Sequence, residues 1–386
     1  MTTEILIVAG EVSGDMHAAR VARALKSLRQ DLHLFGMGGS ALRSAGVETI
    51  IDSEKDASVM GFLEVATKLN TILAAFNKLC FEAKQRKPAL AILTDFPDFN
   101  LRLAERLHSF GIPVMYYISP QVWAWRRGRI KQIKKYVTTM VPILPFEEDF
   151  YRLHRVDAEY LGHPLLDDFI KKGSADSFDR DVFLNENGLN PKEPVLAILP
   201  GSRKIEITRI LPTMLEAFEK MTQEVPTLQA LIPLAVGLER SFVESFIDNK
   251  KIIVIEQQAD AVLKAADATL VTSGTACLEA ALVGAPFVVV YKATPLSYFI
   301  GRLLVRHIKW FSLPNLIAGE EVVTELLQKA ASPERIAATL LPYLTDPQAV
   351  KVFKEKIQIV KDRLTVRDSS ETSAERTAKL ALELLK

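Results

Sequence analysis

The chain has 386 residues and a formal net charge of +1, so the molecule as a whole is not suited to binding a polyanion. Its length corresponds to roughly two or three domains. Two cysteines, Cys80 and Cys277, make no disulfide framework, and no residues have metal-ligand spacing, so we expect neither a metal nor a cofactor. The sequence enters a strand at Ile5 without a basic leader, and no run of about 18 apolar residues predicts a spanning helix, which indicates a cytoplasmic protein.

Strand-like apolar segments alternate with helical segments, which is typical of a parallel α/β fold. In the first half we expect strands at 5–9, 33–36, 90–93, 113–118, 139–143 and 158–161. The helices expected there are 16–28, 63–84, 101–110 and 127–135.

The second half repeats the pattern after a polar connection at 171–194. Its expected strands are 195–199, 229–232, 252–255, 268–271 and 287–290, and the chain is helical from 333 onward. We therefore predict two Rossmann-like domains facing a cleft, residues 1–170 and 190–345, with helices from about 350 to 386 returning to the first domain.

Two strand-loop-helix junctions in the second half predict an anion site. One ends in Ser202 and Arg203, and the other reads Ser273-Gly274-Thr275. Backbone N–H groups at a helix N-terminus favour an anion, although one such junction alone resembles many ordinary α/β turns. Two of them, with an arginine, suggest a diphosphate held between parallel strands and the following helices.

Two more polar residues of the second half are candidates for ligand binding. Glu279 lies one helical turn after Thr275, so it could accept two ribose hydroxyls at the same loop. Asn315 is a plausible polar residue for recognising a ligand, and it lies in the segment 312–319, which we expect to be a loop rather than a helix.

The turn after the first strand contains Glu11, Ser13, Gly14 and Asp15. Small residues let a ligand approach the backbone, but the same turn is also explained if Ser13 or Asp15 only caps the next helix. Glu11 has no capping task, which favours a functional role for this turn.

Two carboxylates follow the strand at 90–93. Asp95 comes directly after it, at the end where α/β sites form, and is a candidate general base. Its alternative is a turn former. Asp98 is better placed to cap the following helix.

Aromatic and basic residues follow the strand at 113–118. Trp123 and Trp125 are either core residues or a platform for a sugar or an acyl chain. The simplest interpretation of the basic run 126–135 is a solvated helix face. A more specific interpretation is contact with an anionic membrane surface, and contact with nucleic acid ranks third. The apolar segment 59–79 is either a core helix or a face that dips into lipid or receives an acyl chain.

These motifs occur together in a known family. They are AGEVSGD at 9–15, VMG at 59–61 with Glu64, DFPDFN at 95–100, SPQVWAWR at 119–126, LPFE at 144–147, GHP at 162–164, LPGSR at 199–203, SGTA at 273–276 and SLPN at 312–315. Nearly the whole chain resembles the lipid-A-disaccharide synthase family. Glu11-Val12-Ser13 departs modestly from many members, which have Ala in the middle, and the tail after 333 follows the family only loosely.

The resemblance implies a GT-B fold and a place in lipid A biosynthesis for the Gram-negative outer membrane. The implied enzyme moves 2,3-diacylglucosamine from its UDP derivative to the 6-hydroxyl of 2,3-diacylglucosamine 1-phosphate. The β-1′,6 linkage is made with inversion and without a metal.

The resemblance also suggests site residues. Asp95 matches the acid proposed for catalysis, and Arg203 and Asn315 match residues tied to donor handling, with Glu11 a further catalytic candidate. The acceptor-side candidates are Ser13, Gly14, Asp15, Met60, Glu64, Ser119, Trp123 and His163. A lone histidine such as His163 is more often structural.

The implied partners are the two glycolipids, the anionic surface of the inner membrane, and a second copy of the chain, since family members form dimers that exchange C-terminal segments. No nucleic acid is expected. Two alternatives stay open. A UDP-sugar epimerase on the same fold would not need the apolar segment 59–79, and a non-catalytic nucleotide-binding membrane module would not need Asp95.

Overall fold

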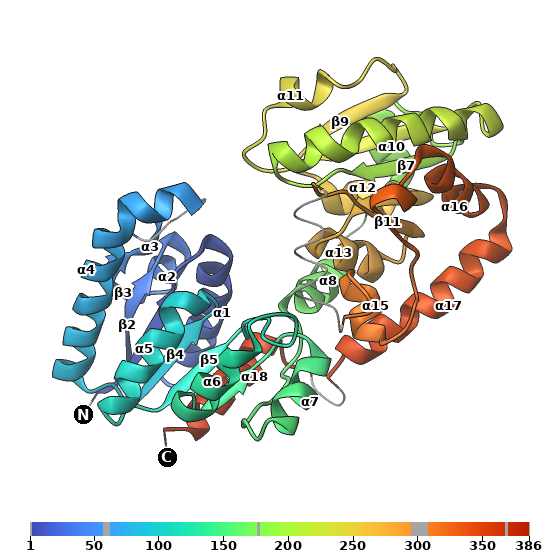
Figure 1. Cartoon of the computed structure of the whole chain (residues 1–386). Helices are drawn as coiled ribbons and strands as arrows, with labels where there is room; N and C mark the ends of the chain where they lie inside the picture. The colour runs from blue at the N-terminus through green and yellow to red at the C-terminus, as the bar shows by residue number, and fades with distance from the viewer. Residues whose placement is uncertain (1, 57–61, 176–177, 295–307, 367–369, 386) are drawn as a thin grey trace. The chain divides into compact units, whose positions relative to one another are not determined.

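The computed structural model describes residues 2–56, 62–175, 178–294, 308–366 and 370–385 (Figure 1). Of the side chains, those of residue 56 and of 62–69 and 172–175 are not described. The chain forms two compact units. The first contains Met1–Asp167 and Val366–Lys386, and the second contains Asp168–Thr365.

The first unit contains a parallel sheet whose described strands run in the order β3-β2-β1-β4-β5-β6. They are β1 Thr3–Ala9, β2 Leu32–Gly38, β3 Glu48–Asp52, β4 Leu90–Thr94, β5 Val114–Tyr117 and β6 Thr139–Val141. Ala9 pairs with Thr94, so β1 and β4 end level at the carboxyl edge of the sheet.

Helices cover both faces of this sheet, which is why an interior strand such as β4 is buried along its whole length (Figure 1). The described helices of this unit are α1 Val12–Leu28, α2 Ser40–Ser44, α3 Ser53–Asp56, α4 Phe62–Arg86, α5 Pro97–Ser109, α6 Ile130–Tyr136 with the 3-10 turn η1 Arg127–Arg129, α7 Pro145–Leu153 and α18 Ser373–Glu383. Along β1, Leu6 and Val8 join the core under α4 and α5, whereas Ile5 and Ile7 join the core under α1 and α18.

The second unit repeats this layout with the strand order β12-β11-β10-β7-β8-β9 among its described residues. The strands are β7 Val195–Leu199, β8 Gln229–Leu234, β9 Ile252–Glu256, β10 Ala268–Thr272, β11 Phe287–Tyr291 and β12 Glu325–Leu327. The helices are α9 Arg180–Glu186, α10 Lys204–Glu224, α11 Arg240–Glu244, α12 Ala259–Ala265, α13 Thr275–Val283, α15 Leu313–Ala318, α16 Pro333–Thr345 and α17 Pro347–Leu364, with the 3-10 turn η2 Gln328–Ala330. The helix α8, Pro164–Ala175, runs across the boundary between the units in sequence.

The expected elements are largely confirmed, with the following corrections. The strand predicted at 158–161 is absent, because Ala158 makes only an isolated bridge to Met140. The polar connection at 171–194 contains the end of α8 and all of α9. Two edge strands, β3 and β12, were not predicted.

The last helices divide between the units. Helix α17 packs on α15 within the second unit, and α18 packs on α1 in the first. Ser373, at the start of α18, donates from its backbone N–H and its hydroxyl to Asp167 at 2.7 and 2.5 Å. Arg376 donates to the Leu161 carbonyl at 2.8 Å, so polar contacts as well as apolar ones fix α18 in place.

Within the ranges described, the chain has no helix that is long and apolar enough to cross a membrane.

Candidate active site

The first part of the candidate site lies at the carboxyl edge of the first sheet, where Glu11 follows β1 and Asp95 follows β4. Asp95 and Phe96 both adopt left-handed backbone conformations, with φ of 47° and 48°. Such conformations are unfavourable for non-glycine residues and persist only where the surroundings hold them. Here the Asp95 carbonyl accepts hydrogen bonds from the Tyr116 hydroxyl at 2.6 Å and from Asn100 Nδ2 at 2.8 Å.

The surroundings of Asp95 suit it to accept a proton near neutral pH. The pKa of its carboxyl is raised to about 6, mainly by burial and also by the negative charge of Glu11, while a hydrogen bond from the Phe96 backbone opposes the rise. A carboxylate is an effective general base when its pKa approaches the working pH.

Gly10 allows the turn carrying Asp95 to pack closely on the turn after β1. A Cβ atom at this position would lie 2.3 Å from the Phe96 ring. The ring of Phe96 in turn stacks on Phe99 at 5.3 Å. The glycine in this motif therefore serves packing beneath the site.

Neither Ser13 nor Asp15 caps the helix that contains it, because α1 already begins at Val12 and its N-cap, Glu11, makes no side-chain capping bond. Asp15 is buried and accepts hydrogen bonds from the backbone N–H groups of Gly39 at 2.7 Å and Ala41 at 2.8 Å. Its carboxylate therefore caps α2. Ser13 is exposed, whereas Gly14 is buried beside Thr94.

The capping role predicted for Asp98 is wrong. The N-cap of α5 is Phe96, without a side-chain capping bond, and Asp98 lies in the first turn. Its carboxylate instead pairs with Arg126, at 3.0 Å from Nη1, and with Arg129. Asp98 thus joins the loop after β5 to the start of α5.

Ser119 and Trp123 both bind a buried carboxylate that the sequence analysis gave no role. Ser119 Oγ and Trp123 Nε1 donate to Glu147 Oε1 at 2.8 and 2.9 Å, and the Leu144 N–H donates to Oε2 at 3.1 Å. Burial raises the pKa of Glu147 to about 7, and these hydrogen bonds oppose the rise. Glu147 anchors the loop 119–126 to the start of α7. The LPFE motif marks a helix start, but nothing local in it indicates these partners.

His163 has a structural position. It is buried, and its Nδ1 accepts a hydrogen bond from the Leu165 N–H at 3.1 Å at the start of α8. Burial, with a smaller effect of His17, lowers the pKa of His163 to about 4, so the ring is neutral at pH 7. Met60 lies outside the described residues, and Glu64 is on α4 with a side chain that is not described.

The second part of the candidate site is a cavity of about 650 Å³ in the second unit. Both predicted junctions line it, because β7 and β10 are neighbours in the sheet and Leu199 pairs with Val271. The donor-side candidates in its wall are Ser202, Arg203, Ser273, Gly274, Thr275 and Glu279. The Thr272 hydroxyl donates to the Leu199 carbonyl at 2.8 Å and fixes the two strand ends together.

The first junction differs from the open N–H cradle expected from the sequence. The backbone N–H groups of Ser202 and Arg203 both donate to Glu206 Oε2 at 3.3 Å. The Arg203 side chain is 79% exposed, and its Nη1 lies 3.4 Å from Glu206 Oε1. The guanidinium is therefore the accessible cationic group of this loop.

The Asn315 side chain is not exposed to a ligand, and its segment is not a loop. It lies in α15 and is completely buried. Its Oδ1 accepts from Val322 and Val323 N–H at 2.8 and 2.9 Å, and its Nδ2 donates to the Val323 carbonyl and to Glu325 Oε1 at 2.8 and 2.9 Å. Asn315 therefore fixes the chain between α15 and β12.

Glu325, which the sequence analysis missed, links this segment to the cavity. It accepts from the N–H groups of Phe311 and Ser312 and from the Ser312 hydroxyl. The Phe311 carbonyl in turn accepts from Ser273 Oγ at 3.4 Å. Glu325 and Asn315 thus support the wall of the cavity from behind it.

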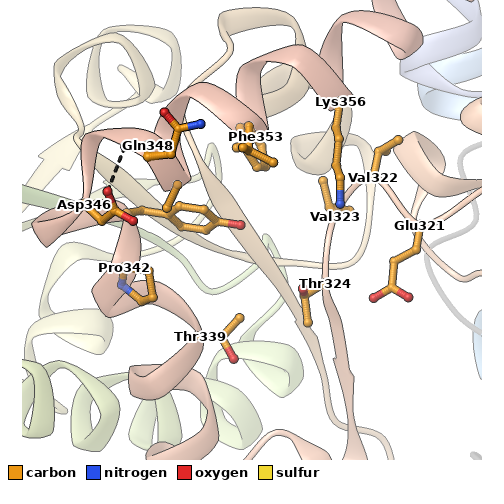
Figure 2. A pocket seen from close by; sticks show the side chains of 13 residues that line it. Glu321, Val322, Val323, Thr324, Thr339, Pro342, Asp346, Gln348, Phe353 and Lys356 are labelled. Atoms are coloured by element: carbon orange, nitrogen blue, oxygen red, sulfur yellow. Dashed lines mark hydrogen bonds between the residues drawn. The ribbon is translucent and has the colours of Figure 1, made fainter.

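A second cavity, of about 570 Å³, lies in the same unit between α16, α17 and residues 321–324. Figure 2 shows Asp346 and Gln348 on one side of it and Lys356 and Glu321 on the other. None of the residues predicted for the active site lines this cavity. No group of three or more potential metal-ligating side chains occurs in the described ranges.

Solved structures show the class of the fold. The UDP-GlcNAc 2-epimerase from Neisseria meningitidis, bound to UDP-GlcNAc, aligns with a TM-score of 0.67 and 12% identity, covering 99% of this chain and 100% of its own. A glycotransferase of kitacinnamycin aligns with a TM-score of 0.64 and 13% identity, covering 99% of each chain. The protein has the predicted two-domain α/β fold of the GT-B class.

Sequence comparison identifies the family within that class. A family model described as lipid-A-disaccharide synthetase matches residues 5–381. The lipid-A-disaccharide synthase of Koribacter versatilis (strain Ellin345) is 42% identical over 99% of this chain and 98% of its own, and that of Myxococcus xanthus (strain DK1622) is 47% identical over 86% of each. The chain belongs to the lipid-A-disaccharide synthase family, and it is a glycosyltransferase that forms the lipid A disaccharide.

We predict that Glu147→Gln loosens the loop 119–126. The Trp123 and Leu144 N–H groups can only donate, and they bind different oxygens of Glu147. A glutamine side chain has only one oxygen, so its NH₂ group would face one of these two N–H groups and leave it without an acceptor. An unsatisfied buried donor costs about 1–3 kcal/mol of stability. Urea unfolding followed by tryptophan fluorescence measures this loss.

The matched control is Glu148→Gln, which removes the ion pair with the exposed Arg152 and should change stability by less than about 0.5 kcal/mol. Equal stability of the two variants would show that the Glu147 network does not hold the loop.

Proposed function

We propose that the enzyme transfers 2,3-diacylglucosamine from its UDP derivative to the 6-hydroxyl of 2,3-diacylglucosamine 1-phosphate. The acceptor oxygen attacks the anomeric carbon as the bond to UDP breaks, so the centre inverts and a β-1′,6 linkage forms. Asp95 takes the proton of the acceptor hydroxyl. The observation that carries this assignment is the half-buried Asp95 beside Glu11, with its pKa raised to about 6, at the carboxyl edge of the first sheet.

We assign the donor to the cavity of about 650 Å³ in the second unit. Ser202, Ser273 and Thr275 supply hydroxyl and backbone groups for the diphosphate, and Glu279 accepts the ribose hydroxyls. The epimerase from Neisseria meningitidis was solved with UDP-GlcNAc bound, which supports a UDP-sugar as the donor.

The departing diphosphate gains negative charge in the transition state, and Arg203 is the cation placed to stabilise it. We propose that this guanidinium performs the role that a metal ion has in other transferases. The Glu206 side chain would move away from the N–H groups of Ser202 and Arg203 when the diphosphate binds to them.

We further propose that the protein works at the surface of the inner membrane, because both substrates carry acyl chains and residues 126–135 are basic. A homodimer is proposed from the family resemblance alone. Sedimentation with anionic vesicles and light scattering test these two proposals.

The direct test of function is incubation of the purified full-length protein with the UDP-linked donor and the 1-phosphate acceptor in mixed micelles. We expect UDP release and a disaccharide whose anomeric coupling is that of a β linkage, with the same rate in EDTA. Epimerisation of the donor without the acceptor would support the epimerase alternative, and UDP binding without either reaction would support the non-catalytic one.

The pH dependence of kcat/KM should report Asp95. A base acts only when deprotonated, so kcat/KM should rise with pH through about 6 and level off above it. Glu11→Gln removes a nearby negative charge, which lowers the pKa of Asp95, so the rising limb should move to lower pH. Kinetics between pH 5 and 8 measure both profiles.

Asp95→Asn is the companion variant, because asparagine tolerates the left-handed backbone at this position. It should fold, bind UDP and lose turnover by about 10²–10⁴-fold. Normal turnover in this variant, or an unchanged rising limb in Glu11→Gln, would show that a residue other than Asp95 is the base.

Arg203→Ala should lower kcat by about 10²–10³-fold with little change in KM, because the arginine acts mainly on charge that develops in the transition state. The control is Arg209→Ala, an exposed arginine further along α10 that does not line the cavity. Steady-state kinetics with varied donor concentration separate the two constants. A rise in KM alone would mean that Arg203 only binds the donor.

A further inference from the structure

An exposed arginine stacks on an exposed tryptophan in the loop after β5. The guanidinium of Arg126 lies over the ring of Trp125, 4.5 Å from its centroid. The two side chains remain about half exposed, Arg126 at 48% and Trp125 as a residue at 41%. Large aromatic side chains are usually buried, so an exposed one under a cation is a feature to explain.

The position of Arg126 is fixed on its other side by Asp98. Its Nη1 lies 3.0 and 3.3 Å from the two oxygens of that carboxylate, and its backbone is left-handed, with φ of 54°. Arg129 binds the same carboxylate. One negative charge is therefore shared by two guanidinium groups, so the cluster of Asp98, Arg126 and Arg129 by itself has a net positive charge. The contact to Asp98 uses Nη1 of Arg126, and a guanidinium has five N–H donors in all.

This arginine cluster lies at the same corner of the sheet as the proposed base. Asp98 follows Asp95 by three residues, and the Asp95 carbonyl binds the hydroxyl of Tyr116. Burial raises the pKa of that hydroxyl most, the negative charges of Asp95 and Asp98 add to the rise, and Arg129 opposes it. Asp95, Asp98 and Arg129 therefore all lie near enough to this hydroxyl to affect its pKa.

The loop is also anchored where it leaves the sheet. Glu147 binds Ser119 and Trp123, and the Trp123 ring packs edge-on against Phe146 at 4.9 Å. A loop held at one end by Glu147 and at the other by Asp98 presents its outer side chains in a fixed arrangement. Such preorganisation reduces the ordering cost of binding a ligand.

We propose that Arg126, supported by Trp125, binds the phosphate monoester of the acceptor sugar. This rests on the proposed function, in which the acceptor carries a 1-phosphate and the donor sugar does not have a free one. A guanidinium binds phosphate oxygens through two parallel hydrogen bonds, and an aromatic face packs on a sugar ring. Arg126 then selects the phosphorylated sugar as acceptor and places it beside Asp95.

The test compares two acceptors on the full-length enzyme, the 1-phosphate and the same sugar with a free 1-hydroxyl. Arg126→Gln should lower kcat/KM for the phosphorylated acceptor by about 10- to 100-fold and change the value for the hydroxyl acceptor by less than about twofold. Arg126→Lys keeps the charge but not the planar fork, so its kcat/KM for the phosphorylated acceptor should lie between those of the wild type and Arg126→Gln. The control is Arg127→Gln, an exposed neighbour that should keep wild-type selectivity.

A binding measurement keeps the test independent of turnover. Glucosamine 1-phosphate should bind the wild type more tightly than glucosamine in an NMR titration, and Arg126→Gln should abolish that difference. If the wild type bound both sugars equally, or if Arg126→Gln lost activity equally with both acceptors, the phosphate role would be overturned.

Two further outcomes can be distinguished from these. Arg126→Gln that retained acceptor selectivity but no longer sedimented with anionic vesicles would identify a membrane contact and overturn the proposal. A wild type that bound glucosamine 1-phosphate through Arg126 but transferred no sugar would support the phosphate site and contradict the proposed function.

Discussion

The pairing of neighbouring parallel strands is the constraint on which the rest of this structure depends. In the first sheet it sets the ends of β1 and β4 level, and in the second it does the same for β7 and β10. Residues at least 70 positions apart in sequence, such as Glu11 and Asp95 or Arg203 and Ser273, thereby come to one sheet edge. The contribution of Glu11 to the raised pKa of Asp95 and the lining of the donor cavity both follow from this register.

The interior strands could be predicted because they are buried on both faces and therefore read as continuous runs of Val, Ile and Leu. The edge strands could not. Strand β3 begins and ends with acidic residues, and β12 has only three residues, so neither gives such a run. The segment 158–161 gives the opposite error, since it was predicted as a strand but forms only an isolated bridge, between Ala158 and Met140.

The reactive positions were easier to predict than the residues that support them. Glycines, hydroxyls and charged residues just after a strand are local signals, and they marked Asp95 and Arg203. The partner of a buried polar group depends on tertiary structure. Asn315 therefore looked like a ligand-binding residue, although Val322, Val323 and Glu325 occupy its amide, and Glu147 had no apparent role although it holds Ser119 and Trp123.

The second unit is a continuous segment, whereas the first is completed only by residues 366–386. During synthesis on the ribosome, the second unit can therefore finish folding while the first still lacks α18. Until then the face of α1 that α18 covers, and the Asp167 carboxylate that binds Ser373, have no partner from this helix. The nascent chain thus exposes an apolar surface until α18 emerges, and such transiently exposed surface makes incompletely folded chains prone to aggregation.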